Sequence, residues 1–117
     1  MTGVQTCALP ISASLAALVL GLERGDGDLI RLAMVDRIAE PARRQLYPGY
    51  AEARAAAIGE GAFGVAVSGA GPTIIALAHW GVAKAIGHAM VEGYRRAGIA
   101  AAAHPAEVDR PGARLLT

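Results

Sequence analysis

The chain has 117 residues, of which 54% are hydrophobic and 4% aromatic, with a formal net charge of +1 and one cysteine. This length fits one domain, the near-zero charge and scarce aromatics argue against nucleic-acid binding, and one cysteine excludes an internal disulfide. No apolar run approaches the roughly 20 residues that cross a bilayer. We therefore expect a cytoplasmic protein with neither a nucleic acid nor a membrane as partner.

The first residues differ in composition from the rest of the chain. Residues 1–11 read MTGVQTCALPI, carry no helical or strand period, and include Pro10 and the lone Cys7. The segment resembles the conceptual translation of a short-read sequencing adapter, because one choice of codons reproduces that adapter. We expect residues 1–12 to be a non-native leader and residues 13–117 to be the natural domain. The alternative is an ordinary disordered N-terminus.

Two helices joined by a short turn are predicted next. Residues 12–24 place apolar side chains at positions i, i+3, i+4 and i+7, which predicts a helix ended by Gly25. We expect Asp28 to cap a second helix that stops near Glu40, because the residue before a proline is disfavoured in helical geometry. The short turn indicates an antiparallel pair. The expected apolar face of the first helix consists of Leu15, Leu18, Val19 and Leu22.

Alternation of apolar and small residues predicts strands in the second half of the chain. Residues 63–67 alternate in this way, and residues 73–78 form a second β-rich run that should pair with the first. Residues 99–106 and 113–116 predict two weaker strands. Pro105 places the first of these at a sheet edge, because proline cannot donate to a ladder.

Helical spacing covers most of the remaining residues. Residues 50–58 predict a third helix after an irregular connector over residues 41–49, and apolar residues spaced by four from Val82 to Tyr94 predict another helix. The order of elements indicates an α+β fold. We expect an antiparallel sheet of about four strands with helices packed on one face, preceded by a helical hairpin.

The most unusual local feature is the stretch Ser68-Gly69-Ala70-Gly71-Pro72 between two predicted strands. Two glycines around an alanine allow positive φ angles and expose successive backbone N–H groups, an arrangement that binds phosphate and other anions. The alternative is a glycine hairpin with a bulge. The stretch is neither a P-loop nor a dinucleotide fingerprint, since it lacks the Gly-Lys-Ser/Thr ending and does not open a helix.

A second candidate is the charged segment over residues 36–44, which follows a predicted helix. Arg43 could bind a carboxylate, because a guanidinium matches it with two parallel hydrogen bonds. The alternative is a solvated helix end with local ion pairs, each worth roughly 0–1 kcal/mol. The three histidines have no metal-ligand spacing, and no Ser/His/Asp or Cys/His arrangement is present. Tyr47 and Tyr50 are interpreted as packing residues.

Several stretches together resemble the C-terminal part of the homoserine kinase family, in the superfamily that includes galactokinase, mevalonate kinase and phosphomevalonate kinase. The stretch over residues 68–72 is typical of the superfamily, whereas the Asp-Arg-Ile-x-Glu-Pro-x-Arg block and a following Pro-Gly-Tyr point to homoserine kinases. Ala39 departs from this pattern, because a histidine is usual there. The matching blocks are Leu22–Leu29, Asp36–Arg43, Leu46–Tyr50 and Gly64–Thr73, and Gly112–Arg114 also fits.

The resemblance implies a ferredoxin-like C-terminal kinase domain in a cytoplasmic, ATP- and Mg²⁺-dependent enzyme that can form homodimers. Such an enzyme phosphorylates the side-chain hydroxyl of L-homoserine in threonine biosynthesis. By position, Arg43 would bind the carboxylate of the substrate, and the loop that approaches the nucleotide phosphates would comprise Ser68, Gly69, Ala70 and Gly71. The resemblance assigns no catalytic and no metal-binding residue to this chain.

The nucleotide-binding motif of that family, a Gly-Leu-Gly-Ser-Ser-Ala type loop that opens a helix, is absent from the sequence. We therefore expect residues 13–117 to be a truncated domain that lacks the N-terminal ATP-binding domain and is inactive alone. Two alternatives are the C-terminal domain of a mevalonate- or sugar-type kinase and a stand-alone ferredoxin-like module that binds an amino acid. The second of these would need neither the leading helices nor the glycine loop.

Overall fold

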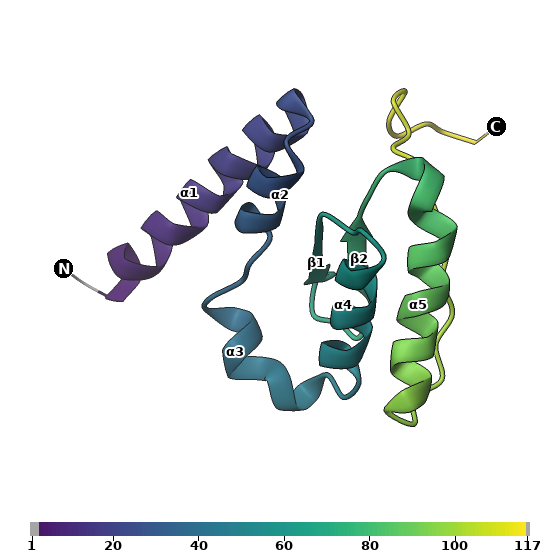
Figure 1. The fold of residues 1–117 in the computed structure, drawn as a ribbon. Coiled ribbons are helices and arrows are strands. Elements are labelled where there is room, and N and C mark those ends of the chain that lie inside the picture. Colours follow the sequence, from purple (N-terminus) through teal and green to yellow (C-terminus); the bar gives the residue numbers. More distant parts are fainter. Residues whose placement is uncertain (1–2, 117) are drawn as a thin grey trace.

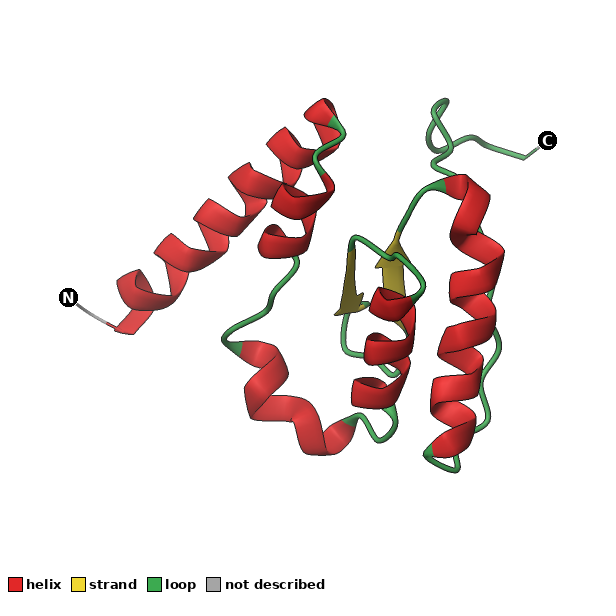
Figure 2. Ribbon diagram, viewed as in Figure 1, coloured by secondary structure: helices red, strands yellow, loops and turns green. Residues whose placement is uncertain are grey.

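The computed structural model describes residues 3–116, which form an α+β fold (Figure 1; Figure 2). Helices surround a small antiparallel hairpin of two strands. Among the described residues, none of the helices combines the length and apolarity that a membrane span requires. The elements in chain order are α1 (Gly3–Arg24), α2 (Gly27–Ala33), α3 (Ala39–Arg43), the 3-10 turn η1 (Arg44–Leu46), α4 (Tyr50–Gly59), β1 (Gly64–Val67), β2 (Ile74–Leu77), the 3-10 turn η2 (Trp80–Val82) and α5 (Ala83–Arg96).

The hairpin of β1 and β2 separates two packing surfaces. Gly64 lies opposite Leu77 and Val67 opposite Ile74, and successive side chains of a strand point to opposite faces. One face packs on the core that α4 and α5 provide. On the other face Met34 covers Gly64 so closely that an added Cβ would lie 2.6 Å from the methionine sulfur. Helices therefore contact both faces, whereas the sequence predicted helices on one.

Helices α4 and α5 lie side by side and form the most extensive contact between two elements of the described chain (Figure 1). The Ala53 side chain of α4 is fully buried, and Gly93 of α5 lies against it. A Cβ at Gly93 would lie 2.7 Å from the Cα of Ala53 and 2.8 Å from the carbonyl oxygen of Glu52. Only a glycine lets the two helix backbones approach this far. The core beside this contact comprises Tyr50, Ala57, Ala62, Val65 and Ile86.

The predicted helical hairpin is present as α1 and α2, with a different cap. The carboxylate of Asp26 accepts a hydrogen bond from the Leu29 amide at 3.0 Å, so Asp26 caps α2 and the prediction of Asp28 was wrong. Asp26 precedes the helix by one residue, which is the position from which a side chain reaches the third amide. Asp28 instead lies in the first turn, where its charge suits the positive end of the helix dipole.

Helix α1 begins at Gly3, so the prediction of a helix start at residue 12 was wrong. Pro10 lies inside it, although a proline in a helix interior removes one hydrogen bond and its ring crowds the preceding turn. The expected apolar face was also wrong, because Leu15, Val19 and Leu22 are 62%, 58% and 55% exposed. The face that meets α2 contains Gly21, where an added Cβ would lie 2.9 Å from the Ile30 side chain.

A separate helix, α3, forms where the sequence predicted the end of α2 and an irregular connector. The carboxylate of Asp36 accepts hydrogen bonds from the amides of Ile38 and Ala39, both at 2.8 Å, and of Glu40 at 3.1 Å. These are free donors at the start of a helix. Pro41 falls in the first turn, where the missing N–H has no helical partner to lose. The expectation that helical structure stops before Pro41 was therefore wrong.

Acidification is expected to weaken the cap of α3. Burial acts to raise the pKa of Asp36, but three backbone donors and the Arg43 charge outweigh it and hold this pKa below its usual value. A carboxyl with a lowered folded-state pKa adds stability above its unfolded pKa, and that stability is lost as the pH falls through the folded value. Asp36→Ala should cost about 0.5–2 kcal/mol at neutral pH.

Urea unfolding at a series of pH values measures both effects. The wild-type chain should lose more stability than Asp36→Ala between about pH 6 and about pH 3, because only the wild type protonates this carboxyl. Equal losses in the two proteins would show that the Asp36 cap does not contribute to folding.

Two predicted strands do not form. Residues 99–106 run along α5 without joining the ladder, and residues 113–116 lie in an exposed C-terminal segment, where Leu116 is 99% exposed. A strand needs a hydrogen-bonded neighbour about 4.8 Å away, and neither segment makes ladder hydrogen bonds with any of residues 3–116. The described residues thus form two of the four expected strands.

Candidate functional site

The loop over residues 68–72 makes a tight reversal between β1 and β2. The Ser68 amide donates to the Thr73 carbonyl at 2.8 Å, and the Gly71 amide donates to the Ser68 carbonyl at 3.1 Å. Gly69 and Gly71 have φ angles of +59° and +76°, in the left-handed region that favours glycine. Both glycines are thus required by the turn itself.

Two neighbouring backbone amides of this loop have no hydrogen-bond acceptor among the described residues. Gly69 and Ala70 are exposed, and neither amide donates a hydrogen bond to another residue in the part of the chain that the structure describes. Consecutive free N–H groups beside a left-handed residue are an arrangement that accepts an anion. Since the Gly71 amide is bonded to Ser68, the loop offers the amides of Gly69 and Ala70 to a ligand.

Tyr47 contacts the loop over residues 68–72 through both its hydroxyl and its ring. Its hydroxyl donates a hydrogen bond to the Ala70 carbonyl at 3.0 Å. Its ring packs on Gly71, where an added Cβ would lie 2.5 Å from a ring carbon. Sequence reasoning treated Tyr47 as packing and missed this contact. The block over residues 46–50 was the available signal, because it is one of the stretches that resemble homoserine kinases.

The two loop glycines are expected to differ sharply when replaced. Gly69→Ala should cost roughly 1–2 kcal/mol, the penalty of a left-handed alanine, because nothing lies within 4 Å of the added Cβ. Gly71→Ala carries the same penalty and also displaces the Tyr47 ring, which should add roughly 1–3 kcal/mol. Urea unfolding of the two variants measures the difference. Equal destabilisation would mean that Tyr47 does not pack against the loop.

Arg43 lies in the last turn of α3 and is exposed. Among the described residues it makes no ion pair or hydrogen bond, although its charge contributes to the low pKa of Asp36 against the effect of burial. Its guanidinium is thus open to a ligand. No hydrogen bond or ion pair joins Arg43 to residues 68–72, and the chain between them runs through η1 to Tyr47, which does bond to the loop.

Tyr50 fixes the segment that carries Arg43. The Tyr50 ring is 3% exposed, and its hydroxyl donates to a carboxylate oxygen of Glu40 at 2.8 Å. Burial, followed by the bond to this carboxylate and its charge, raises the pKa of Tyr50 well above its usual value. Tyr50 therefore remains a neutral donor, and it ties α3 to the core that contains Val65.

The described residues supply little else that could hold a cofactor. No group of three His, Cys, Asp or Glu side chains gathers within residues 3–116. His79 stacks edge to face on Phe63, with ring centroids 4.9 Å apart. The candidate site therefore consists of a loop that offers two amides and an exposed arginine on a neighbouring segment.

Residues 17–96 match the family model described as GHMP kinases C terminal. Because the match covers more than half of the chain, the chain belongs to this family. A protein of Trichormus variabilis named homoserine kinase is 41% identical over 102 residues, which is 87% of this chain and 34% of that protein. The homoserine kinase of Natronomonas pharaonis is 41% identical over 120 residues, with 97% of this chain and 41% of that protein covered.

A solved structure gives the same comparison in three dimensions. The crystal structure of homoserine kinase from Cytophaga hutchinsonii superposes with a TM-score of 0.69 and 37% sequence identity, over 82% of this chain and 30% of that one. This chain therefore spans about a third of the length of the curated relatives it matches.

Proposed function

We propose that this chain is the C-terminal part of a homoserine kinase, an enzyme that transfers the γ-phosphoryl group of ATP to the side-chain hydroxyl of L-homoserine. The observation that carries the proposal is the identity of about 40% to homoserine kinases over most of the chain. We also propose that the whole enzyme lies in the cytoplasm, takes part in threonine biosynthesis and forms a homodimer. Its C-terminal domain would contain a ferredoxin-like sheet of about four strands.

The chain's own residues would bind and orient the two substrates. The amides of Gly69 and Ala70 would donate hydrogen bonds to phosphate oxygens of ATP, which suits phosphoryl transfer because that reaction depends on positioning and charge stabilisation. The Ser68 hydroxyl lies at the start of the same exposed loop. Arg43 would hold the carboxylate of L-homoserine through two parallel N–H donors. Tyr47 and Tyr50 would keep these groups in place.

The described residues offer Mg²⁺ no site built from three or more of their own His, Cys, Asp or Glu side chains. In the proposed enzyme the ion would depend on phosphate oxygens of ATP and on one or two carboxylates. Residues 13–117 alone are expected to show no ATP-dependent turnover of L-homoserine, and turnover by the purified segment would contradict this.

A chimera tests the proposed function. Residues 13–117 replace the matched segment of the Trichormus variabilis enzyme, and ADP release is measured with L-homoserine, mevalonate and galactose. ATP-dependent turnover of L-homoserine supports the proposal, and turnover of mevalonate or galactose instead would identify another kinase of the superfamily. An inert chimera, together with calorimetric binding of threonine or homoserine by the chain alone, would support an amino-acid-binding module.

We also propose that residues 1–12 are a non-native leader in front of the natural domain. The side chains of residues 8–12 are exposed, as expected for a segment that packs on nothing. The nucleotide sequence tests this proposal. Codons for residues 2–11 that differ from the adapter would contradict it.

A further inference from the structure

The segment over residues 40–50, which we call the strap, is held at two points. The hydroxyl of the buried Tyr50 donates to the Glu40 carboxylate at 2.8 Å and so attaches the start of the strap to the core. Further along, the Tyr47 hydroxyl donates to the Ala70 carbonyl at 3.0 Å and attaches the strap to the glycine loop. Arg43 lies between the two attachments in sequence. Both hydrogen bonds therefore restrain the backbone that carries this arginine.

The backbone between Arg43 and Tyr47 is short and hydrogen-bonded. Arg43 ends α3, η1 follows at once, and the Tyr47 amide donates to the Arg44 carbonyl at 3.1 Å. The Tyr50 amide donates to the Tyr47 carbonyl at 3.1 Å, where α4 begins. Helix and turn thus join Arg43 to Tyr47 without an extended linker. The two side chains are carried by one backbone unit, so a displacement of one displaces the other.

Ala70 connects the strap to the two amides that the loop offers to an anion. Its carbonyl accepts the Tyr47 hydroxyl, whereas its own amide and that of Gly69 donate to no other described residue. The carbonyl and the amide of one residue are separated only by its φ and ψ torsions, so fixing the Ala70 carbonyl restricts the direction of the Ala70 amide. An oriented loop binds an anion more tightly than a loose one, because less conformational entropy is lost on binding.

We propose that Tyr47 is a positioning residue that couples the two substrate sites, so that L-homoserine on Arg43 and ATP on the glycine loop each strengthen the binding of the other. The proposal rests on the proposed function, from which it takes both ligands. A carboxylate on Arg43 holds the strap, the strap holds Ala70 through Tyr47, and the loop amides are oriented before the phosphates arrive. Coupling between two bound ligands is reciprocal, so one factor describes both directions.

Calorimetry on the chimera measures this factor. An ATP analogue with an imido bridge between its β- and γ-phosphates, which is not turned over, is titrated with and without saturating L-homoserine, and L-homoserine is titrated with and without the analogue. We expect each ligand to lower the Kd of the other at least fivefold, within the usual range of such couplings. Tyr47→Phe keeps the ring against Gly71 and removes only the hydroxyl. It should reduce the factor to less than about twofold.

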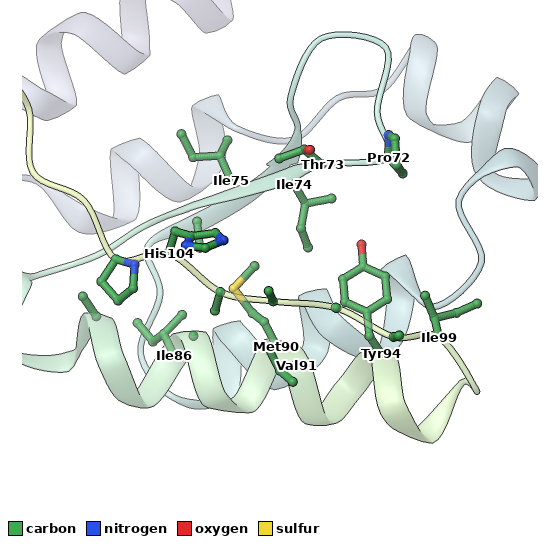
Figure 3. Close-up of a pocket in the computed structure, with 18 residues that line it drawn as sticks. Pro72, Thr73, Ile74, Ile75, Ile86, Met90, Val91, Tyr94, Ile99 and His104 are labelled. Atoms are coloured by element: carbon green, nitrogen blue, oxygen red, sulfur yellow. The ribbon is translucent and has the colours of Figure 1, made fainter.

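Tyr94→Phe is the matched control for Tyr47→Phe. The Tyr94 ring also packs on a glycine, since an added Cβ at Gly49 would lie 2.7 Å from a ring carbon. Figure 3 shows this ring rising from α5 into a cavity of about 430 Å³ beside β2, which Pro72 and Thr73 also line. The Tyr94 hydroxyl bonds to no other residue in the described part of the chain. The control should therefore keep the full coupling factor.

Amide hydrogen exchange of the full chain, followed by NMR, tests the restraint on the loop without any ligand. The Gly71 amide donates to the Ser68 carbonyl inside the loop, so its exchange reports how often the loop opens. Tyr47→Phe should speed this exchange at least about threefold, as expected for the loss of one hydrogen bond. Unchanged exchange of the β1–β2 ladder shows that the variant is folded. An unchanged rate at Gly71 would overturn the proposal.

The remaining outcomes separate this inference from the proposed function. An active chimera in which neither ligand changes the Kd of the other would overturn the inference alone. Coupling that survives Tyr47→Phe, or that is lost equally in Tyr94→Phe, would also overturn it. An inert chimera that binds both ligands cooperatively and loses the coupling with Tyr47→Phe would support the inference and contradict the proposed function. A chimera that binds neither ligand would overturn both.

Discussion

Gly93→Ala is expected to destabilise the chain by roughly 1–3 kcal/mol, although alanine favours helices. The added Cβ would lie 2.7–2.8 Å from backbone atoms of Ala53 and from the Glu52 carbonyl. Backbone atoms of a helix cannot move aside as a flexible side chain can. The two helices must therefore separate, which loosens contacts around Ile86 and Tyr50 in the core. Thermal unfolding followed by circular dichroism should show a melting temperature lower by several degrees per kcal/mol.

Gly59→Ala is the matched control for this prediction. Gly59 ends α4, the other helix of the pair, and nothing lies within 4 Å of an added Cβ there. The substitution should be neutral or should stabilise by up to about 1 kcal/mol, through helix propensity alone. A Gly93→Ala variant that matches Gly59→Ala would show that α4 and α5 do not approach as closely as the structure has them.

The sequence predicted the elements whose apolar period is long and uninterrupted. The helix from Val82 to Tyr94 was predicted from a spacing of four residues and is confirmed as the main part of α5. The strands on either side of residues 68–72 were predicted from alternation and are confirmed by their pairing. Where one face of a helix or strand packs on the core, burial requires apolar residues at the spacing of that element. This spacing can be read from the sequence alone.

The parts that the sequence did not predict depend on partners distant in the chain or on competing caps. Asp36 accepts hydrogen bonds from three backbone amides at the start of α3. Pro41 was expected to prevent helical structure there, but the effect of a proline depends on its position within the helix. The orientation of α1 could not be read from its own apolar residues, since Gly21 rather than the leucine face meets α2.

The candidate site was predicted in part. The backbone of the turn at residues 68–72 adopts positive φ angles that require glycine, so the sequence alone indicates the turn. Tyr47 contacts Ala70 across 23 residues of sequence, and no local pattern reports such a contact. The unpaired segment over residues 99–106 has the composition of a strand, yet pairing depends on a neighbour that no described residue provides. Local chemistry was thus predictable, and tertiary pairing was not.

Arg43→Ala in the chimeric enzyme is expected to raise the KM for L-homoserine far more than the KM for ATP. Arg43 is exposed and unpaired in the described chain, so its donors are available to a carboxylate that arrives with the substrate. A desolvated charge pair of this kind contributes roughly 2–5 kcal/mol when one partner is removed. Since 1.4 kcal/mol is a factor of ten, the KM for L-homoserine should rise by about 30-fold or more. Steady-state kinetics with each substrate varied in turn measures both constants.

Arg44→Ala is the matched control, because Arg44 is the adjacent residue, carries the same charge and is also exposed. It should change neither KM by more than about threefold, the scale of an exposed charge in water. Arg43→Lys should recover only part of the affinity, because an ammonium group keeps the charge but loses the paired donors that fit a carboxylate. Equal changes in both KM values for Arg43→Ala would place this side chain outside the homoserine site, and full recovery by lysine would exclude the two-donor contact.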